Sequence, residues 1–298
     1  MTSARPGLPP LHLLLALAVM AVWGSNFVVI KFGVEHLPPL TLAFLRFALA
    51  FFPLALFLPR PQVPWRNLAA YGVLIGAGQF GLLFTAMRAD ITPGLASLVV
   101  QAQAFFTIGL AVWLNGERPA AYQIGALLLA SAGIVTIALH TDGSATPLGL
   151  VLVLGAALSW AGGNMVSRAA GPVNMLAYVV WSSLFALPPL LGMALLLEGW
   201  PRISAGIAAA DSLTWASVLW QSVGNTMFGY GAWGWLMMRH EAGSVAPLSL
   251  LVPVFGLGTS ALVLGEPLQP WKLTAFALVM AGLALGVLWP RIKGMLAS

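Results

Sequence analysis

The sequence contains no cysteine and very few charged residues. None of its 298 residues is a cysteine, and Asp, Glu, Lys and Arg together make up only 7%. The lack of cysteine excludes a disulfide framework and thiolate ligands, and it leaves the redox compartment undefined. The scarcity of charge excludes a water-soluble fold of this size, because 60% of the residues are apolar and the mean hydropathy is +0.93. The composition therefore predicts a polytopic membrane protein.

The apolar residues form ten runs that are long enough to cross a bilayer as helices. The hydrocarbon core requires about 20 helical residues per crossing, and short polar or Pro/Gly-marked breaks separate the runs. A helix also satisfies its own backbone hydrogen bonds in lipid. The expected fold class is an all-α bundle of ten transmembrane helices, at residues 11–33, 38–58, 67–87, 93–114, 120–140, 147–168, 174–197, 213–238, 243–264 and 270–289.

The basic residues are distributed unevenly around these spans. If the N-terminus is cytoplasmic, the inside holds Arg5, Arg60, Arg66, Arg118, Arg168, Arg239, Arg291 and Lys293, and the outside holds Lys31, Arg88, Arg202 and Lys272. This excess obeys the positive-inside rule. The net charge of +5 is therefore interpreted as a sign of topology, not of a nucleic-acid surface, and both termini are expected in the cytoplasm.

The two halves of the chain share a pattern at an offset of 149 residues. The Gly-Glu pair at 116–117 aligns with the pair at 265–266, and Gly94 aligns with Gly243. Because each half holds five spans, an odd number, the second copy must enter the membrane from the opposite side. We expect two inverted five-helix repeats, at residues 1–140 and 141–298. Inverted repeats are typical of secondary transporters, although a duplication can also simply enlarge a bundle.

A tryptophan and an asparagine recur close together on the first span of each half. Trp23 and Asn26 lie one turn apart in the first span, and Trp160 and Asn164 repeat the pattern in the sixth. An unpartnered asparagine in hydrocarbon costs several kcal/mol, so both must face protein or water. Each alone would equally fit a hydrogen bond between helices. The recurrence beside a tryptophan favours a cavity wall.

Further amide and aromatic side chains lie within the third, fourth and eighth spans. Gln101 is preferred to Gln103, because two residues on a helix point about 200° apart and only one of them is expected to face a cavity. Rings combined with amides suit a small amphipathic solute. The predicted substrate-binding residues are Trp23, Asn26, Gln79, Gln101, Trp160, Asn164, Tyr230 and Trp233.

Ionisable groups are nearly absent from the spans. Arg46 is the one such residue well inside a span, where we expect it to snorkel or to bind a backbone carbonyl or a helix C-terminus. Proton-coupled carriers normally hold a carboxylate or a histidine near the midplane. The pattern favours uniport or exchange of a neutral or zwitterionic solute.

Two alternatives remain open. One is a proton-coupled multidrug or metabolite efflux carrier. The alternative of another class, a membrane-embedded enzyme, would need a nucleophile with its base, or metal ligands, at membrane depth. The four histidines do not offer this, because they lie at span ends: His12, His36, His140 and His240. We expect no catalytic residue, metal or cofactor.

The chain resembles the drug/metabolite transporter superfamily, in particular its EamA-type ten-helix carriers. The features that carry this resemblance are two five-helix halves, each with a Trp/Asn-bearing first helix and a short Gly-Glu loop before its fifth helix. The resemblance covers residues 11–289. The tryptophan content and size are similar to those of bacterial exporters of aromatic amino acids. The resemblance to this superfamily implies a multi-pass inner-membrane carrier. In such a carrier the first, third and fourth helices of each repeat surround a central cavity, and the fifth helices pack together. The expected partners are a small-molecule substrate and the lipid bilayer; no nucleic acid is expected, and the carrier is expected to be monomeric.

Overall fold

The computed structural model describes residues 8–115, 118–140 and 142–296. These ranges are almost entirely helical, which confirms the expected all-α class. Within them, nine helical segments are long and apolar enough to cross a membrane. The eighth expected span is also one continuous helical segment, from Ser212 to Arg239, but Gln221 and Asn225 in its middle lower its hydropathy. A tenth crossing therefore stays a prediction.

The first half of the chain contains the helical segments of the first five spans. The first span is α1 (Pro10–His36), and the second is α2 (Pro39–Phe51) followed by η1 (Leu54–Leu56). The third joins α3 (Trp65–Gly72), η2 (Val73–Gly81) and α4 (Leu82–Ala89). The fourth joins α5 (Pro93–Val99), η3 (Val100–Ala102) and α6 (Gln103–Asn115), and the fifth is α7 (Ala121–Ala138).

The second half repeats this order with one additional short helix. It begins with α8 (Pro147–Ala169), α9 (Met175–Met193) and η4 (Ala194–Glu198), and α10 (Trp200–Ala209) is the additional helix. The eighth span joins α11 (Ser212–Leu219), η5 (Trp220–Tyr230) and α12 (Gly231–Arg239). The ninth joins α13 (Ala242–Val245), η6 (Ala246–Leu250) and α14 (Leu251–Leu264), and α15 (Pro270–Leu296) is last.

Prolines mark where several of these helices begin. Pro10, Pro39, Pro93, Pro147 and Pro270 are each the first residue of their helix. The first turn of a helix has no acceptor for its N–H groups, so the missing N–H of proline costs nothing there. The Pro/Gly breaks between the apolar runs therefore become helix starts.

Departures from α-helical geometry recur in both halves. The third and eighth spans widen into π-helix at η2 and η5, and the fourth and ninth tighten into 3-10 helix at η3 and η6. Shifting η2 by 149 residues places it within η5. Pro247 lies in η6, so the ninth span changes geometry at a proline that removes a helical hydrogen bond.

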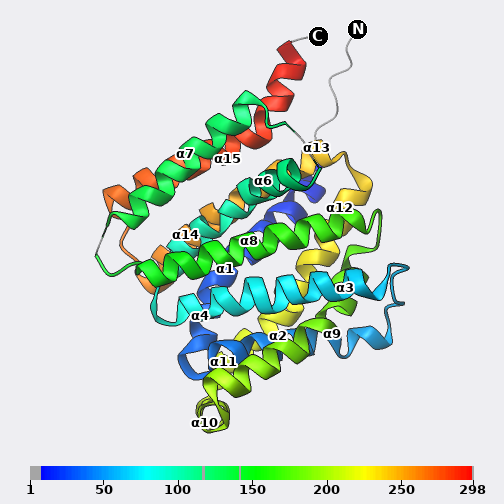
Figure 1. Ribbon diagram of the computed structural model, residues 1–298, viewed down its shortest axis with the longest axis vertical. Coiled ribbons are helices and arrows are strands. Elements are labelled where there is room, and N and C mark those ends of the chain that lie inside the picture. The colour runs from blue at the N-terminus through cyan, green and yellow to red at the C-terminus, as the bar shows by residue number, and fades with distance from the viewer. Residues whose placement is uncertain (1–7, 116–117, 141, 297–298) are drawn as a thin grey trace.

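The helices run between two ends of the molecule, here called proximal, where α1 begins, and distal, where α1 ends. In Figure 1, α7 and α15 lie side by side at one edge of the bundle. A Cβ added at Gly282 of α15 would lie 2.6 Å from the carbonyl oxygen of Ala126 in α7. The fifth helices thus pack together, as the resemblance implied, and the glycine permits the close approach.

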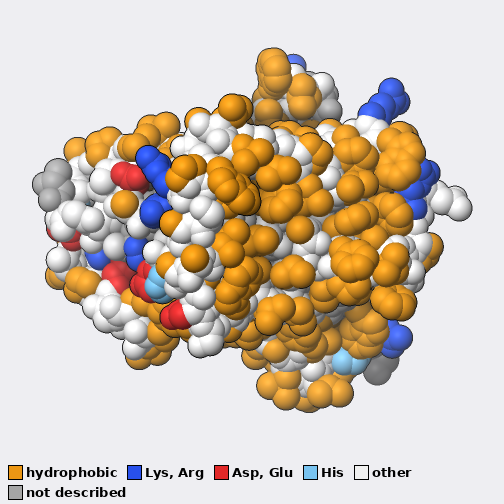
Figure 2. Space-filling view, turned by 90° about the horizontal axis from the view of Figure 1, so that it is seen from below, with side chains coloured by type: hydrophobic (Ala, Val, Ile, Leu, Met, Phe, Trp, Pro, Cys, Tyr) orange, Lys and Arg blue, Asp and Glu red, His pale blue; other side chains and the backbone are white. Residues whose placement is uncertain are grey.

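The surface carries an apolar belt between the two ends. Leucines such as Leu128, Leu196 and Leu262 are 66–87% exposed, which suits contact with lipid. Figure 2 shows hydrophobic side chains over the middle of one face. The charged side chains on that face gather toward the two ends.

Candidate substrate cavity

A central cavity of about 300 Å³ lies among the spans. Its walls come from the first, third, fourth, sixth, eighth and ninth spans, with Met175 added from the seventh. The described lining comprises Trp23, Asn26, Phe27, Ile30, Tyr71, Gln79, Phe80, Leu83, Val100, Gln101, Gln103, Trp160, Asn164, Met175, Asn225, Tyr230, Trp233, Ser249 and Val252. All eight residues predicted from the sequence line this one cavity.

Trp23 anchors an aromatic cluster on one wall. Its ring centroid lies 5.5 Å from those of both Tyr230 and Trp233. Its Nε1 donates to the carbonyl oxygen of Asn225 at 3.2 Å. The ring packs closely on Gly229, where an added Cβ would come within 2.3 Å of Nε1. The first and eighth spans are therefore joined at the cavity through flat surfaces that suit an aromatic or amphipathic solute.

The two predicted asparagines occupy different polar environments. Asn26 is 3% exposed, and its Oδ1 has no hydrogen-bond partner. Asn164 donates to Gln103 Oε1 at 2.9 Å and to Thr107 Oγ1 at 3.2 Å. Asn164 thus both lines the cavity and bonds to the neighbouring α6, so it fits both interpretations. The acceptor of Asn26 is therefore buried and unfilled beside the cavity.

The expectation that Gln101 lines the cavity while Gln103 points away is wrong, because both line it. The physical reason is η3, the 3-10 turn immediately before Gln103. At three residues per turn, positions two apart differ by about 240°, which leaves them about 120° apart the other way round. The cavity extends around this side of the helix, and the Asn164 bond holds Gln103 on it.

Several lining residues were not among those predicted from the sequence. Asn225 lies in the polar middle of the eighth span, and that polarity was its available signal. Tyr71 packs on Tyr178 with ring centroids 4.7 Å apart. Nothing in the sequence distinguishes Tyr71 or Met175 from ordinary helix-packing residues. Their places follow from how the third and seventh spans pack.

Arg46 does not snorkel and does not bind a backbone carbonyl, so this expectation is corrected. The side chain is 1% exposed, and its Nη2 donates to Thr226 Oγ1 at 3.2 Å. Its Cζ lies 3.8 Å from the ring centroid of Phe80, a cavity-lining residue. Aromatic packing keeps the guanidinium inside the bundle, directly behind the cavity wall.

Glu266 links the distal ends of the fourth, ninth and tenth spans. It accepts hydrogen bonds from the Gly94 N–H at 3.1 Å and from the hydroxyls of Thr92 and Ser260. Lys272 is fully buried and donates to Glu266 at 3.2 Å, so at this distal end it is a buried partner of Glu266. The aligned pair at 116–117 lies outside the described residues, as does Arg5. Distally, α5 packs against α14, whereas the proximal α6 packs against α8.

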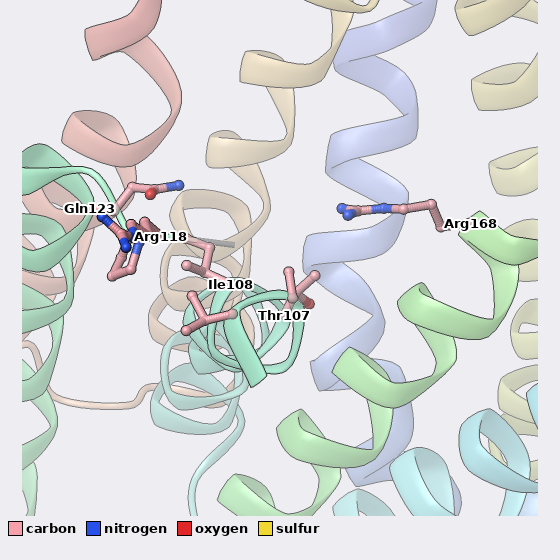
Figure 3. Close-up of a pocket in the computed structure, with 8 residues that line it drawn as sticks. Thr107, Ile108, Arg118, Gln123 and Arg168 are labelled. Carbon is pink, nitrogen blue, oxygen red and sulfur yellow. The ribbon is translucent and has the colours of Figure 1, made fainter. Parts of the chain in front are cut away.

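A smaller pocket of about 130 Å³ lies proximal to the cavity. Figure 3 shows Arg118 and Gln123 on one side, with Arg168 extending from α8 on the other. Thr107 lines this pocket and accepts the Asn164 bond. This proximal pocket therefore adjoins the central cavity through one polar contact.

Comparisons with known proteins agree with this architecture. The EamA-like transporter family matches residues 10–139 and again 147–288. A probable amino-acid metabolite efflux pump of Salmonella typhimurium is 44% identical over 94% of this chain and 95% of that protein. Its Escherichia coli namesake is 43% identical over 92% and 93%.

Two more distant matches extend the comparison. A probable terminal-alkyne amino-acid exporter of Streptantibioticus cattleyicolor is 27% identical over 89% of this chain and 90% of its own. A solved crystal structure shares the fold, with a TM-score of 0.62, 18% identity, and coverage of 95% of this chain and 98% of its own. With its apolar spans and central cavity, the chain belongs to the EamA-like transporter family.

Proposed function

We propose that this chain exports amino acids or closely related amphipathic metabolites across a bacterial inner membrane. The observation that carries the proposal is the lining of the central cavity, which combines aromatic rings with amides and, among the described residues, contains no Asp, Glu or His. Such a lining suits a net-neutral or zwitterionic solute with a ring or an apolar side chain. The names of the related efflux pumps support the same class of substrate. Aromatic amino acids are the favoured members because of the Trp23, Tyr230 and Trp233 cluster.

Transport would proceed by alternating access between two inverted five-helix repeats, residues 1–140 and 141–298. The double match to one family and the recurrence of π-helix at the offset of 149 residues both support this duplication. The packing of α5 against α14 and the Glu266 bonds would hold the distal end of the bundle together in this state. Exchange of the two repeats' conformations would open that end and close the other.

The proximal end would be cytoplasmic. Among the described residues, this end carries Arg60, Arg66, Arg118, Arg168 and Arg239, and the distal end carries Glu35, Asp90, Asp142, Glu198, Asp211 and Glu266. The positive-inside rule assigns the arginine-rich end to the cytoplasm. In this orientation an exporter would take up solute at the proximal end and release it at the distal end.

Uptake into proteoliposomes tests the proposal. Purified protein is reconstituted, and uptake of labelled phenylalanine, tryptophan and leucine is measured with and without an imposed pH gradient, with protein-free liposomes as the control. Saturable, aromatic-selective uptake that ignores the gradient supports uniport or exchange. Gradient-driven uptake favours the proton-coupled alternative. A lack of flux with every amino acid contradicts the proposed substrate class.

A further inference from the structure

Arg46 is a buried cation without an anionic partner. It lies in the middle of α2 and is 1% exposed. Among the described residues, its guanidinium makes one hydrogen bond, from Nη2 to Thr226 Oγ1. No carboxylate of those residues pairs with it, and its Nε and Nη1 have no acceptor. A charge held this way within a membrane span is costly, and such residues usually mark a ligand path.

Aromatic rings account for only part of the environment of Arg46. Its Cζ lies 3.8 Å from the Phe80 ring centroid, 5.0 Å from that of Phe47 and 6.0 Å from that of Phe84. Rings of this kind stabilise the faces of a guanidinium. The N–H groups point outward in its plane, and each unfilled donor retains its desolvation cost. The aromatic packing therefore leaves the in-plane donors to be filled by an anion.

We propose that Arg46 binds the carboxylate of the transported solute, with Phe80 acting as a movable cover over the guanidinium. Phe80 both contacts Arg46 and lines the cavity, so rotation of its ring would open the guanidinium to the solute. A carboxylate matches the forked geometry of arginine and would replace the missing anion. The proposal rests on the proposed function, and it defines the substrate as a carboxylate-bearing solute.

The cavity also offers a complementary group for the other end of an amino acid. Asn26 lines the cavity, and its buried Oδ1 has no donor, so a small turn of the amide would let it accept from an ammonium group. The aromatic cluster around Trp23 would then hold the side chain. Arg46 supplies the charge that the amides cannot, and this distinguishes an amino acid from its amide or amine.

Competition for labelled phenylalanine uptake by the reconstituted full chain tests this role. The competitors are phenylalanine, 3-phenylpropionate, phenylalaninamide and phenethylamine; only the first two carry a carboxylate. In the unmodified protein we expect both carboxylates to compete well and the amide and amine poorly. In Arg46→Gln we expect the KM for phenylalanine to rise by about thirtyfold or more, as when one member of a buried charge pair is removed. Inhibition by the amide should stay unchanged.

Three further variants separate carboxylate recognition from structural support. Arg46→Lys keeps the charge and should keep a weaker carboxylate preference. Arg60→Gln removes an exposed arginine that stacks on Trp65 at 4.3 Å, and it should leave the competition series unchanged. Phe80→Leu uncovers Arg46 without removing it, so it should raise the preference for carboxylates over amides. This last variant keeps the test decisive if Arg46→Gln does not fold.

The outcomes that overturn the proposal differ from those that overturn the proposed function. Equal losses for all four competitors in Arg46→Gln would show a purely structural residue, and an unchanged series would show no role in recognition. An unchanged carboxylate preference in Phe80→Leu would also contradict the proposal that Phe80 covers Arg46. If the unmodified protein takes up no amino acid, the proposed function fails. Arg46 is then tested by thermal stabilisation of the purified proteins with 3-phenylpropionate, which should stabilise the unmodified chain but not Arg46→Gln.

Discussion

Asn26 and Asn164 repeat in the sequence, but their hydrogen bonds differ. Asn26 leaves its Oδ1 free, whereas Asn164 ties α8 to α6 through Gln103 and Thr107. An oxygen without a donor contributes little to the stability of the resting protein. A bond between two moving helices contributes to both stability and transport. The two asparagines should therefore respond differently to the same substitution.

The first prediction concerns replacement of these asparagines by alanine. Asn26→Ala should leave thermal stability nearly unchanged and lower solute uptake several-fold, because it removes an acceptor that only the solute fills. The double variant with Asn164→Ala should lower uptake by about tenfold or more, which corresponds to about 1.4 kcal/mol. Both are measured in proteoliposomes with matched protein content.

Asn174→Ala is the matched control for that measurement. Asn174 caps α9, where its side chain accepts from the Ala177 N–H, and it does not line the cavity. Loss of the cap should cost about 1 kcal/mol of stability without changing the KM. Full uptake by the double variant in correctly inserted protein would remove both asparagines from the proposed site.

The second prediction concerns Gly229, which lies against the Trp23 ring. A Cβ there would meet Nε1 at 2.3 Å, so Gly229→Ala must displace the ring and weaken its bond to Asn225. We expect a loss of about 1–3 kcal/mol, seen as a lower unfolding temperature in detergent. Gly109→Ala is the control, because nothing lies within 4 Å of its added Cβ. A similar temperature for both variants would contradict the close packing.

At the scale of elements, the regular parts of the fold were predictable from the sequence and the irregular parts were not. Hydropathy placed each expected span on a helical segment, because length and apolarity alone decide a crossing. It could not reveal η3, the tight turn that brings Gln103 to the cavity beside Gln101. It also missed the burial of Lys272, because that depends on a loop folding back onto Gly94. Long-range packing, which a single sequence does not display, set these features.

The third prediction concerns the pair formed by Glu266 and Lys272. Glu266→Gln would leave the fully buried Lys272 ammonium without a counter-charge, so we expect a loss of about 3–5 kcal/mol in stability. Adding Lys272→Met should restore much of it, because an apolar side chain needs no partner. Thermal unfolding of the single and double variants checks this. A double variant less stable than Glu266→Gln alone would show that Lys272 stabilises the fold without its partner.

At the scale of the whole molecule, the arrangement of charge predicts orientation. Most of the described arginines lie at the proximal end, and most acidic residues lie at the distal end. The chain contains no cysteine, so single cysteines can be introduced without removing any native ones.

The fourth prediction uses those single cysteines. Ala120→Cys lies before α7 at the proximal end, and Ala208→Cys lies in α10 at the distal end; both positions are exposed. A membrane-impermeant maleimide should label Ala208→Cys in intact cells and Ala120→Cys only after the cells are opened. The unmodified chain is the blank. The reverse pattern would place the arginine-rich end outside the cell and contradict the proposed orientation.

The π-helical stretches η2 and η5 lie in the middle of the two spans that supply Gln79 and Asn225 to the cavity. A π-helical turn holds more residues than an α-helical turn, so the hydrogen-bond partner of each N–H changes at the boundary between the two. Moving the boundary by one residue exchanges hydrogen bonds one at a time and rotates the residues that it passes. The geometry therefore permits the cavity wall to turn its side chains while each span remains a continuous, hydrogen-bonded rod in the membrane.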